Sequence, residues 1–371
     1  MIRRRWITKL GYGLYLFAFV EVALQTFYFA TAGDFLFRRA ALPIYAANAH
    51  SGVFNRPGLA YDHRTNEFEA TYYTDGAGLR VPNADVRVAR DKAEGAFRIL
   101  LLGPSFAYGW GVNYEDSFVA QVEDRLESQG YRDGRDVEIV NAGVPSLPAS
   151  PHLRWYEAVG RDYRPDLVVQ FVYGSMAIGG DAEAGGSVTE DGYLVFSDLN
   201  LRYRVREQAK RVATVFYAWA VWARWSALSD DTNDRSVQGA GRELHLADAF
   251  DLSDPTVATS LDFYDRLRSV VEQDGASLLV VYFPLSYAVH AEDRTRWRHL
   301  GIRDIAAQAS FDEAFGGHLR SRGFDVLDLS AVLRQAAEGG DRLYYWLDIH
   351  WTPRGNEVAA DAVATHLTGK N

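Results

Sequence analysis

The stretch Arg98–Val112, which reads RILLLGPSFAYGWGV, decides the fold class. Its first half is continuously apolar, as in a buried strand, and Ser105 stands on the turn that follows Gly103. A helix-like segment follows at Glu115–Gln129. Open α/β sheets place nucleophiles at such strand-to-helix turns, because the turn lies at the carboxyl end of the strand. The stretch therefore predicts a parallel α/β sheet with a candidate nucleophile at its edge.

A second stretch near the other end of the chain supplies the groups that such a nucleophile needs. Residues 346–355 read WLDIHWTPRG and contain Asp348 and His350. A histidine can take the proton of a serine, and a carboxylate can orient the imidazole and stabilise its charge. The two stretches together predict a Ser105/His350/Asp348 constellation.

Further apolar runs extend the predicted sheet. Continuous Val/Leu/Ile runs that alternate with helical patterns indicate a parallel sheet covered on both faces. We therefore expect a three-layer α/β/α sandwich. The predicted strands are Phe97–Leu102, Asp136–Asn141, Asp166–Val172, Ser277–Phe283 and Phe324–Leu329, and the main predicted helices are Ser117–Gln129, Ser260–Gln273, Arg303–Arg322 and Asn356–Leu367.

Composition excludes several function classes. The 371-residue chain is 48% hydrophobic, which suffices for one large domain with additions. Its formal net charge of −10 argues against a nucleic-acid partner. The chain has no cysteine, so disulfides, thiolate catalysis and Cys-ligated zinc are excluded. The eight histidines other than His350 show no metal-ligand spacing, and no nucleotide-binding loop is present, so we expect neither metal nor cofactor.

The N-terminus carries a candidate membrane anchor. Residues 1–9 are basic, and an apolar segment at 10–32 contains a 22-residue run, Gly11–Ala32, long enough for a bilayer that needs ~20 helical residues. The excess of positive charge before the run predicts a cytoplasmic N-terminus, a single pass through the inner membrane and a main domain in the periplasm. The alternative is a cleaved signal peptide, because Ala30-Thr31-Ala32 resembles a cleavage site.

Two polar residues interrupt the apolar run. Glu21 and Gln25 are four residues apart and therefore share one face of a helix. One interpretation is tolerated polarity in a single anchor. The other is a contact face for a membrane protein partner, because an unpaired acidic group at membrane depth is costly.

The remainder divides into a lead-in and a main domain. Residues 33–95 lack strong periodicity and are expected to pack on the main domain at 96–370. An insert at 179–254 breaks the strand–helix alternation and contains the aromatic, apolar stretch Val212–Ser226. We expect this stretch to be a helix over the mouth of the site; the alternative is a helix that lies on the membrane or on a partner subunit.

In these motifs the chain resembles the SGNH/GDSL hydrolase superfamily, and more narrowly its bacterial membrane-anchored members of the alginate O-acetyltransferase type. The resemblance covers roughly Thr74 to Leu367 and rests on motifs that occur in the expected order. These are Gly78-Leu79-Arg80, the Arg98–Val112 stretch, Asn141-Ala-Gly-Val-Pro145, Pro165-Asp-Leu-Val-Val169 and Asp348-Ile-His-Trp-Thr-Pro353. It implies an SGNH-like sandwich.

The resemblance also implies site roles. Ser105 matches the nucleophile, His350 the base and Asp348 the carboxylate that orients it. Gly143 matches a glycine whose backbone N–H stabilises the oxyanion, together with the amide of Ser105. Two signature blocks depart from the pattern. Pro104 replaces the usual aspartate before the serine, and the asparagine of the third block is missing, with Ser175 as the nearest polar substitute.

Two functions follow from this sequence. The first is an envelope esterase or O-acyltransferase that acts on a small ester or an acylated glycan through Ser105, His350 and Asp348. The alternative is a catalytically degenerate SGNH-fold subunit that serves as a structural component of a larger membrane complex, since losing one oxyanion donor can cost ~10²–10³ in rate.

Overall fold

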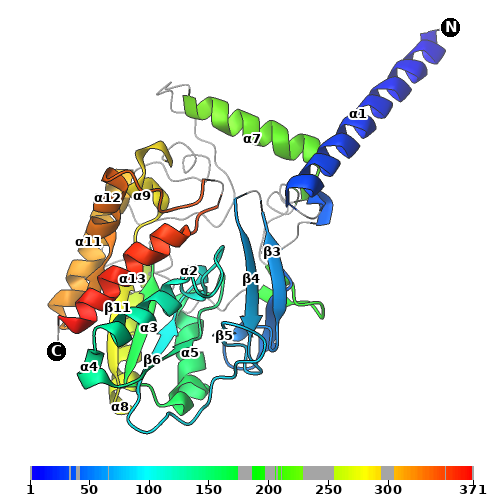
Figure 1. Ribbon diagram of the computed structural model, residues 1–371. Coiled ribbons are helices and arrows are strands. Elements are labelled where there is room, and N and C mark those ends of the chain that lie inside the picture. Colours follow the sequence, from blue (N-terminus) through cyan, green and yellow to red (C-terminus); the bar gives the residue numbers. More distant parts are fainter. Residues whose placement is uncertain are drawn as a thin grey trace.

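A mixed β-sheet forms the centre of the protein in the computed structural model (Figure 1). The structure describes residues 2–32, 35–38, 42–65, 67–173, 186–196, 205, 208–209, 211–228, 255–293, 305–346 and 348–369. Within these residues the sheet has eight strands. In spatial order they are β12 (Asp325–Asp328), β11 (Ser277–Tyr282), β8 (Leu167–Val172), β6 (Phe97–Leu102), β7 (Val137–Asn141), β5 (Arg80–Val81), β4 (Glu69–Thr74) and β3 (Ala60–Arg64).

The five strands predicted from the apolar runs form the parallel part of this sheet. β12, β11, β8, β6 and β7 run parallel to their neighbours, as expected. β5 joins the edge of β7 in antiparallel orientation, and β4 and β3 continue in the same manner. The predicted α/β fold with a parallel sheet is therefore confirmed, and antiparallel strands extend this sheet at the β7 edge. The lead-in supplies three antiparallel strands whose short alternating pattern gave no clear signal.

Helices cover both faces of the sheet. Along β6, Ile99 and Leu101 point to one side and Leu100 and Leu102 to the other, and all four are buried. The face that receives Ile99 is covered by α3 (Phe118–Ser128), α12 (Ser330–Glu338) and α13 (Pro353–Thr368), and the opposite face by α5 (Ala149–Ala158), α8 (Pro255–Gln273) and α11 (Ile305–Ser321). Strands buried on both sides explain the continuous apolar runs.

Shorter elements complete the description. Two hairpins lie outside the main sheet, β1 (Tyr45–Asn48) with β2 (Gly52–Asn55) and β9 (Gly186–Val188) with β10 (Leu194–Phe196). The short helical segments are η1 (Leu36–Arg38), α2 (Ser105–Tyr108), α4 (Tyr131–Gly134), η2 (Gly160–Tyr163), α9 (Ser286–Val289) and η4 (Ala291–Asp293).

The N-terminal helix α1 (Ile2–Ala32) projects away from the α/β domain (Figure 1). Within it, Trp6–Thr31 is the one segment of the described residues long and apolar enough to cross a membrane, by length and composition. A signal sequence has the same properties. The end of α1 is followed by η1 and lies next to α7 (Ala213–Leu228) from the insert.

Helix α7 packs against α1 through its N-terminal end. Its expected position over the mouth of the site stays a prediction. Glu21 and Gln25 hydrogen-bond to this region of the same chain, since Ala213 N–H donates to Glu21 and the Gln25 amide donates to Arg211 C=O. The polar face of α1 therefore has a partner within the protein itself. A separate membrane protein at this face stays a prediction.

Glu123 on α3 gives the fold a testable pH dependence. Burial raises the pKa of Glu123 to about 7, even though the Ile139 N–H donates to its carboxylate. The folded state thus binds this proton more tightly than the unfolded state, where the pKa is near 4.5. The folded state loses stability as the pH rises from the unfolded to the folded pKa of Glu123, because the buried carboxyl group is then deprotonated. This loss is complete above pH ~7. Glu123→Gln is therefore expected to raise the free energy of unfolding at pH 8.5 by on the order of 2–3 kcal/mol, and by much less at pH 5.

Urea unfolding at the two pH values measures this difference. The control is Glu272→Gln, an exposed residue on α8 that does not contribute to the pKa of Glu123, and it should leave the pH dependence unchanged. Equal stabilisation by Glu123→Gln at both pH values would contradict the assignment.

Candidate active site

The turn after β6 places Ser105 at the carboxyl end of the central strand. Gly103 allows this turn because a Cβ there would lie 2.6 Å from the Cβ of Phe171 and 2.9 Å from that of Ala107. Pro104 precedes α2 with φ −76°, a value that its ring permits, and its carbonyl accepts from Tyr108 N–H at 3.2 Å. The Asn141 amide donates to Ala107 C=O at 3.0 Å and holds the same turn from β7. These contacts hold the loop in place of the missing aspartate.

The three predicted catalytic side chains meet in the structure. Ser105 comes from α2, and His350 and Asp348 come from the loop before α13. His350 Nε2 lies 2.5 Å from Ser105 Oγ, and His350 Nδ1 hydrogen-bonds to Asp348 Oδ1. The backbone N–H of His350 donates to the same carboxylate oxygen at 3.0 Å. This is the nucleophile–base–carboxylate order required for serine acyl transfer.

Asp348 is held in its ionised form. Burial alone would raise the pKa of Asp348, but the charge of His350 and its side-chain and backbone hydrogen bonds hold that pKa well below its usual range. The Trp110 indole adds a donor, with Nε1 3.4 Å from Asp348 Oδ2. An ionised carboxylate accepts from Nδ1–H, which leaves Nε2 free to accept the Ser105 proton.

Aromatic rings support the imidazole. The His350 ring packs against Phe106, with centroids 4.8 Å apart, and against Trp110, with centroids 5.3 Å apart. His63 lies with its edge against Trp110 and hydrogen-bonds to Tyr72 OH at 2.9 Å. The imidazole therefore has little freedom to leave its position beside Ser105.

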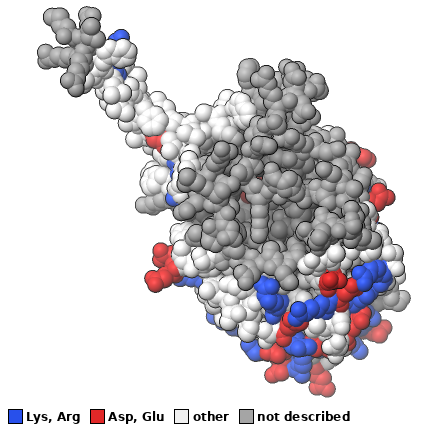
Figure 2. Space-filling view, turned by 180° about the vertical axis from the view of Figure 1, so that it is seen from behind, with Lys and Arg blue, Asp and Glu red and all other residues white. Residues whose placement is uncertain are grey.

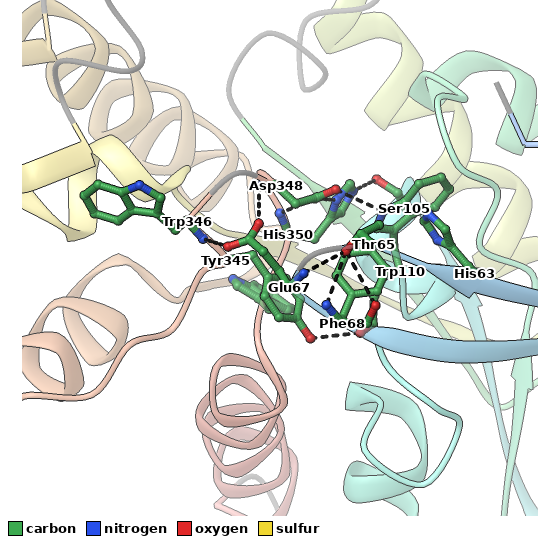
Figure 3. A network of polar contacts seen from close by, with 12 residues as sticks. His63, Thr65, Glu67, Phe68, Ser105, Trp110, Tyr345, Trp346, Asp348 and His350 are labelled. Atoms are coloured by element: carbon green, nitrogen blue, oxygen red, sulfur yellow. Dashed lines mark hydrogen bonds and ion pairs between the residues drawn. The ribbon is translucent and has the colours of Figure 1, made fainter. Parts of the chain in front are cut away.

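Glu67 is a site residue that the sequence gave no reason to select. It lies at the tip of the β3–β4 hairpin and faces the loop that carries the catalytic acid and base (Figure 3). Its Oε1 accepts from Trp346 N–H at 2.6 Å, and its Oε2 accepts from Asp348 N–H at 2.9 Å. The adjacent Thr65 Oγ1 accepts from the Glu67 N–H at 3.1 Å and so fixes the hairpin tip. One carboxylate thus connects the lead-in to the backbone of Asp348.

The candidate oxyanion donors differ in whether they are free to donate to a substrate. Ser105 begins α2, so its N–H has no carbonyl partner within that helical turn. Gly143 N–H, which the family resemblance assigned to the oxyanion, instead donates to Asn141 Oδ1 at 2.9 Å. Its use as a donor would require this hydrogen bond to break. Ser175 lies outside the described residues.

The other predicted contact residues, Glu21 and Gln25, are on α1 and not in this site (Figure 1). Among the described residues, no group of three or more His, Asp or Glu side chains is arranged to hold a metal ion.

Comparison with known families matches part of the chain. Residues 241–371, the part of the chain that contains Asp348 and His350, match the family described as "SGNH hydrolase-like domain, acetyltransferase AlgX". The resemblance to the SGNH hydrolases is confirmed. Two curated relatives are named "Probable alginate O-acetylase AlgJ". The one from Pseudomonas syringae pv. tomato is 25% identical over 154 residues, and the one from Pseudomonas fluorescens is 26% identical over 107 residues.

These matches cover only parts of the proteins. They include 39% and 29% of this chain, and the chain spans 38% and 26% of the two relatives. Among solved structures, a G-D-S-L family lipolytic protein from Desulfitobacterium hafniense is 14% identical, with a TM-score of 0.39 over 72% of this chain and 98% of that one. The α/β hydrolase LAE5 from the Lake Arreo metagenome is 11% identical, with a TM-score of 0.41 over 74% and 96%. Likeness at these levels carries no functional inference.

Proposed function

We propose that this protein is a membrane-anchored serine esterase or O-acyltransferase whose α/β domain faces the periplasm. The observation that carries the proposal is the hydrogen-bonded series Ser105–His350–Asp348, in which His350 Nε2 lies 2.5 Å from Ser105 Oγ. The match of residues 241–371 to an acetyltransferase family supports the same chemistry. The apolar helix Trp6–Thr31, with basic residues before it, supports the anchor and its orientation.

In the first half of the reaction Ser105 becomes acylated. Its Oγ attacks the carbonyl carbon of an ester while His350 Nε2 takes the hydroxyl proton. The ionised Asp348 stabilises the resulting imidazolium through the Nδ1 hydrogen bond. The carbonyl oxygen becomes an oxyanion, to which the Ser105 N–H donates. Collapse of the tetrahedral intermediate breaks the ester C–O bond, and His350 gives its proton to the departing alcohol.

In the second half an acceptor hydroxyl removes the acyl group. His350 takes the proton of the acceptor as its oxygen attacks the acyl–Ser105 ester, and it then returns a proton to Ser105 Oγ. Water as acceptor gives hydrolysis, whereas a sugar hydroxyl gives a new O-acyl ester. The name of the two relatives, "Probable alginate O-acetylase AlgJ", favours an acetyl group and a glycan as the substrate class.

An acetyl-transfer assay tests this function. The purified full chain in detergent is incubated with p-nitrophenyl acetate, with and without soluble acidic and neutral oligosaccharides. The release of p-nitrophenol reports acylation of the enzyme, and a mass increase of one acetyl group on a sugar reports transfer. Release that depends on Ser105 supports the proposal. Absence of both products from a folded protein, with acetyl and longer-chain esters alike, would contradict it.

Glu67 provides a positioning test of the same mechanism. Its two oxygens hold the backbone of Trp346 and Asp348, so its loss would let the acid–base loop shift. Glu67→Ala is expected to lower kcat for p-nitrophenyl acetate by about 10- to 100-fold with little change in KM, because misplacement of reacting groups by ~1 Å costs this much. Glu67→Gln keeps one acceptor oxygen, so its kcat should lie between those of the wild type and Glu67→Ala.

The matched control for this prediction is Glu69→Gln in the same hairpin. Glu69 is exposed and pairs with Arg64 at the surface, so its replacement should leave both constants unchanged. A Glu67→Ala protein with the wild-type kcat would show that the loop does not depend on this carboxylate. A parallel change in KM and melting temperature, without a specific loss of kcat, would indicate a purely structural role.

A second candidate function is a non-catalytic subunit of a membrane complex. The occupied Gly143 N–H favours it, since one predicted oxyanion donor is already used by Asn141. On this hypothesis the protein co-purifies with the same neighbouring membrane protein after extraction in mild detergent, and Ser105→Ala leaves both the association and the cellular function intact. Loss of function in Ser105→Ala cells with the association retained would exclude the subunit as the complete description.

A further inference from the structure

Helix α7 is apolar on nearly all sides, and several of its large apolar side chains are exposed. Of its 16 residues only Arg224 is charged. Trp219, Val221 and Trp222 are each more than two-fifths exposed, and Val221 reaches 68%. A helix that is hydrophobic all round belongs in a protein core or in a membrane. The packing described for α7 is against α1, and the exposed fractions of these three side chains show that they are not buried in a protein core.

The N-terminus of α7 is fixed to α1 by Glu21. The Glu21 carboxylate accepts from the N–H groups of Ala213 and Thr214 at 2.7 and 2.9 Å, and from Thr214 Oγ1 at 2.9 Å. The first N–H groups of a helix have no intrahelical acceptor, and a carboxylate there also interacts favourably with the helix dipole. The Gln25 amide donates to both Glu21 and Arg211 C=O and extends the junction. The polar groups of both helices thus satisfy each other.

This junction lies within the candidate membrane span. Glu21 is inside Trp6–Thr31, so α7 begins at a level of α1 that would be surrounded by lipid. Polar groups at such a depth are tolerated where they hydrogen-bond to one another, as they do here. In Figure 2 many Lys, Arg, Asp and Glu side chains gather at the lower end of the domain, and most of the described atoms of the projecting helix are uncharged, with a few charged side chains visible on it.

An apolar cleft opens at the same place. It has a volume of about 540 Å³ and lies between α1, η1 and the residues before α7. Its apolar lining comes from Phe17, Val22, Phe35, Phe37 and Val212, and its polar lining from Glu21, Gln25, Thr26, Gln208 and Arg211. Its open side is continuous with the exposed Val22 of α1. Acyl chains of lipids fit such a surface by chemistry and by size.

We propose that α7 is a second membrane-embedded element, which lies among the lipid acyl chains beside α1 and is held there by Glu21. The inference rests on the proposed membrane anchor and adds to it a second contact with the bilayer. The protein is then attached to the bilayer by two segments that are not adjacent in the chain.

The absence of cysteine makes a direct test simple, because any introduced cysteine is the single one in the chain. Bimane is attached to Val221→Cys on α7, to Val22→Cys on α1 and to Glu127→Cys on the exposed surface of α3, and each full-length protein is reconstituted into phosphatidylcholine/phosphatidylglycerol vesicles. Lipids brominated on their acyl chains quench a probe within the bilayer, and iodide quenches a probe in water. We expect bromolipid quenching at positions 221 and 22 and iodide quenching at position 127. Retained p-nitrophenyl acetate turnover or an unchanged circular dichroism spectrum shows that each variant is folded.

The outcomes separate the inference from the anchor. Iodide quenching at position 221 with bromolipid quenching at position 22 would keep the anchor and overturn the placement of α7. Iodide quenching at both positions would overturn the anchor and the inference together. A Glu21→Ala change in the Val221→Cys protein should shift the probe toward iodide quenching, while the same change in the Val22→Cys protein should not. Unchanged bromolipid quenching at position 221 in Glu21→Ala would overturn the role given to Glu21.

Discussion

Ser105→Ala is expected to reduce the rate of p-nitrophenyl acetate hydrolysis by about 10⁴- to 10⁶-fold. The rate that remains is the one that substrate binding and the oxyanion donors support without the nucleophile. The hydroxyl lies 2.5 Å from the His350 imidazole and is the described group placed to form the acyl–enzyme ester. His350→Ala should have a similar effect, because the serine then has no base. Since the two residues act as a unit, the Ser105→Ala/His350→Ala double variant is expected to fall no further than either single variant.

Initial-rate kinetics on the three variants check this expectation. Ser128→Ala, an exposed serine on α3, is the control and should retain wild-type rates. Losses that multiply in the double variant would mean that Ser105 and His350 contribute separately. Wild-type turnover in Ser105→Ala would place the chemistry elsewhere in the protein.

Asp348→Asn is expected to lower kcat by about 10³- to 10⁴-fold with little change in the fold. An asparagine amide that donates to His350 Nδ1 favours the wrong imidazole tautomer, in which Nε2 carries the proton and cannot accept one from Ser105. The Trp110 indole, which donates to Asp348 Oδ2, would then face an amide group of altered hydrogen-bonding character. Steady-state kinetics give the loss in kcat, and the melting temperature reports the fold.

The pH dependence of this variant gives an independent check. The pKa of Asp348 is held well below its usual range, so the carboxylate stays ionised throughout the pH range of an assay. A carboxyl group whose pKa is lower in the folded than in the unfolded state stabilises the fold at pH values above its unfolded-state pKa. This stabilisation is lost as the pH falls through its folded-state pKa. The wild type should therefore lose more stability than Asp348→Asn when the pH is lowered from 5 toward 2. Equal acid sensitivity of the two proteins would contradict the charge assigned to Asp348.

The sequence was most informative where structure is local. The five apolar runs became the five parallel strands within one or two residues at each end, because a strand buried on both faces is apolar throughout. The turn at Ser105 and the pair Asp348 and His350 were also identified from local motifs, and the structure brings them together. The family resemblance supplied their order in the mechanism.

The sequence did not predict those contacts of the site that join segments far apart in the chain. Glu67 is a single acidic residue in a lead-in without strong periodicity, and its partners at Trp346 and Asp348 are almost the whole chain away. No local sequence pattern indicates such a contact. Trp110 was visible in the Ser105 stretch, but its hydrogen bond to Asp348 depends on how the two loops approach each other.

Two other expectations changed for physical reasons. Gly143 was assigned to the oxyanion by motif alone, whereas in the folded protein its N–H donates to Asn141 Oδ1. Glu21 and Gln25 were expected to face a partner in the membrane, and their need for hydrogen bonds was real. The insert meets that need with the start of α7, about 190 residues further along the chain.

Labelling with a fluorophosphonate serine-hydrolase probe tests the central claim most directly, because the probe reacts with a serine only where a base activates it. The full-length protein, Ser105→Ala, His350→Ala and Ser128→Ala are treated in parallel and the adducts located by mass spectrometry. We expect one adduct on Ser105 in the wild type and in Ser128→Ala, and none in Ser105→Ala or His350→Ala. A folded wild-type protein that remains unlabelled, or an adduct that persists in His350→Ala, would contradict the claim that Ser105, His350 and Asp348 form a working catalytic site.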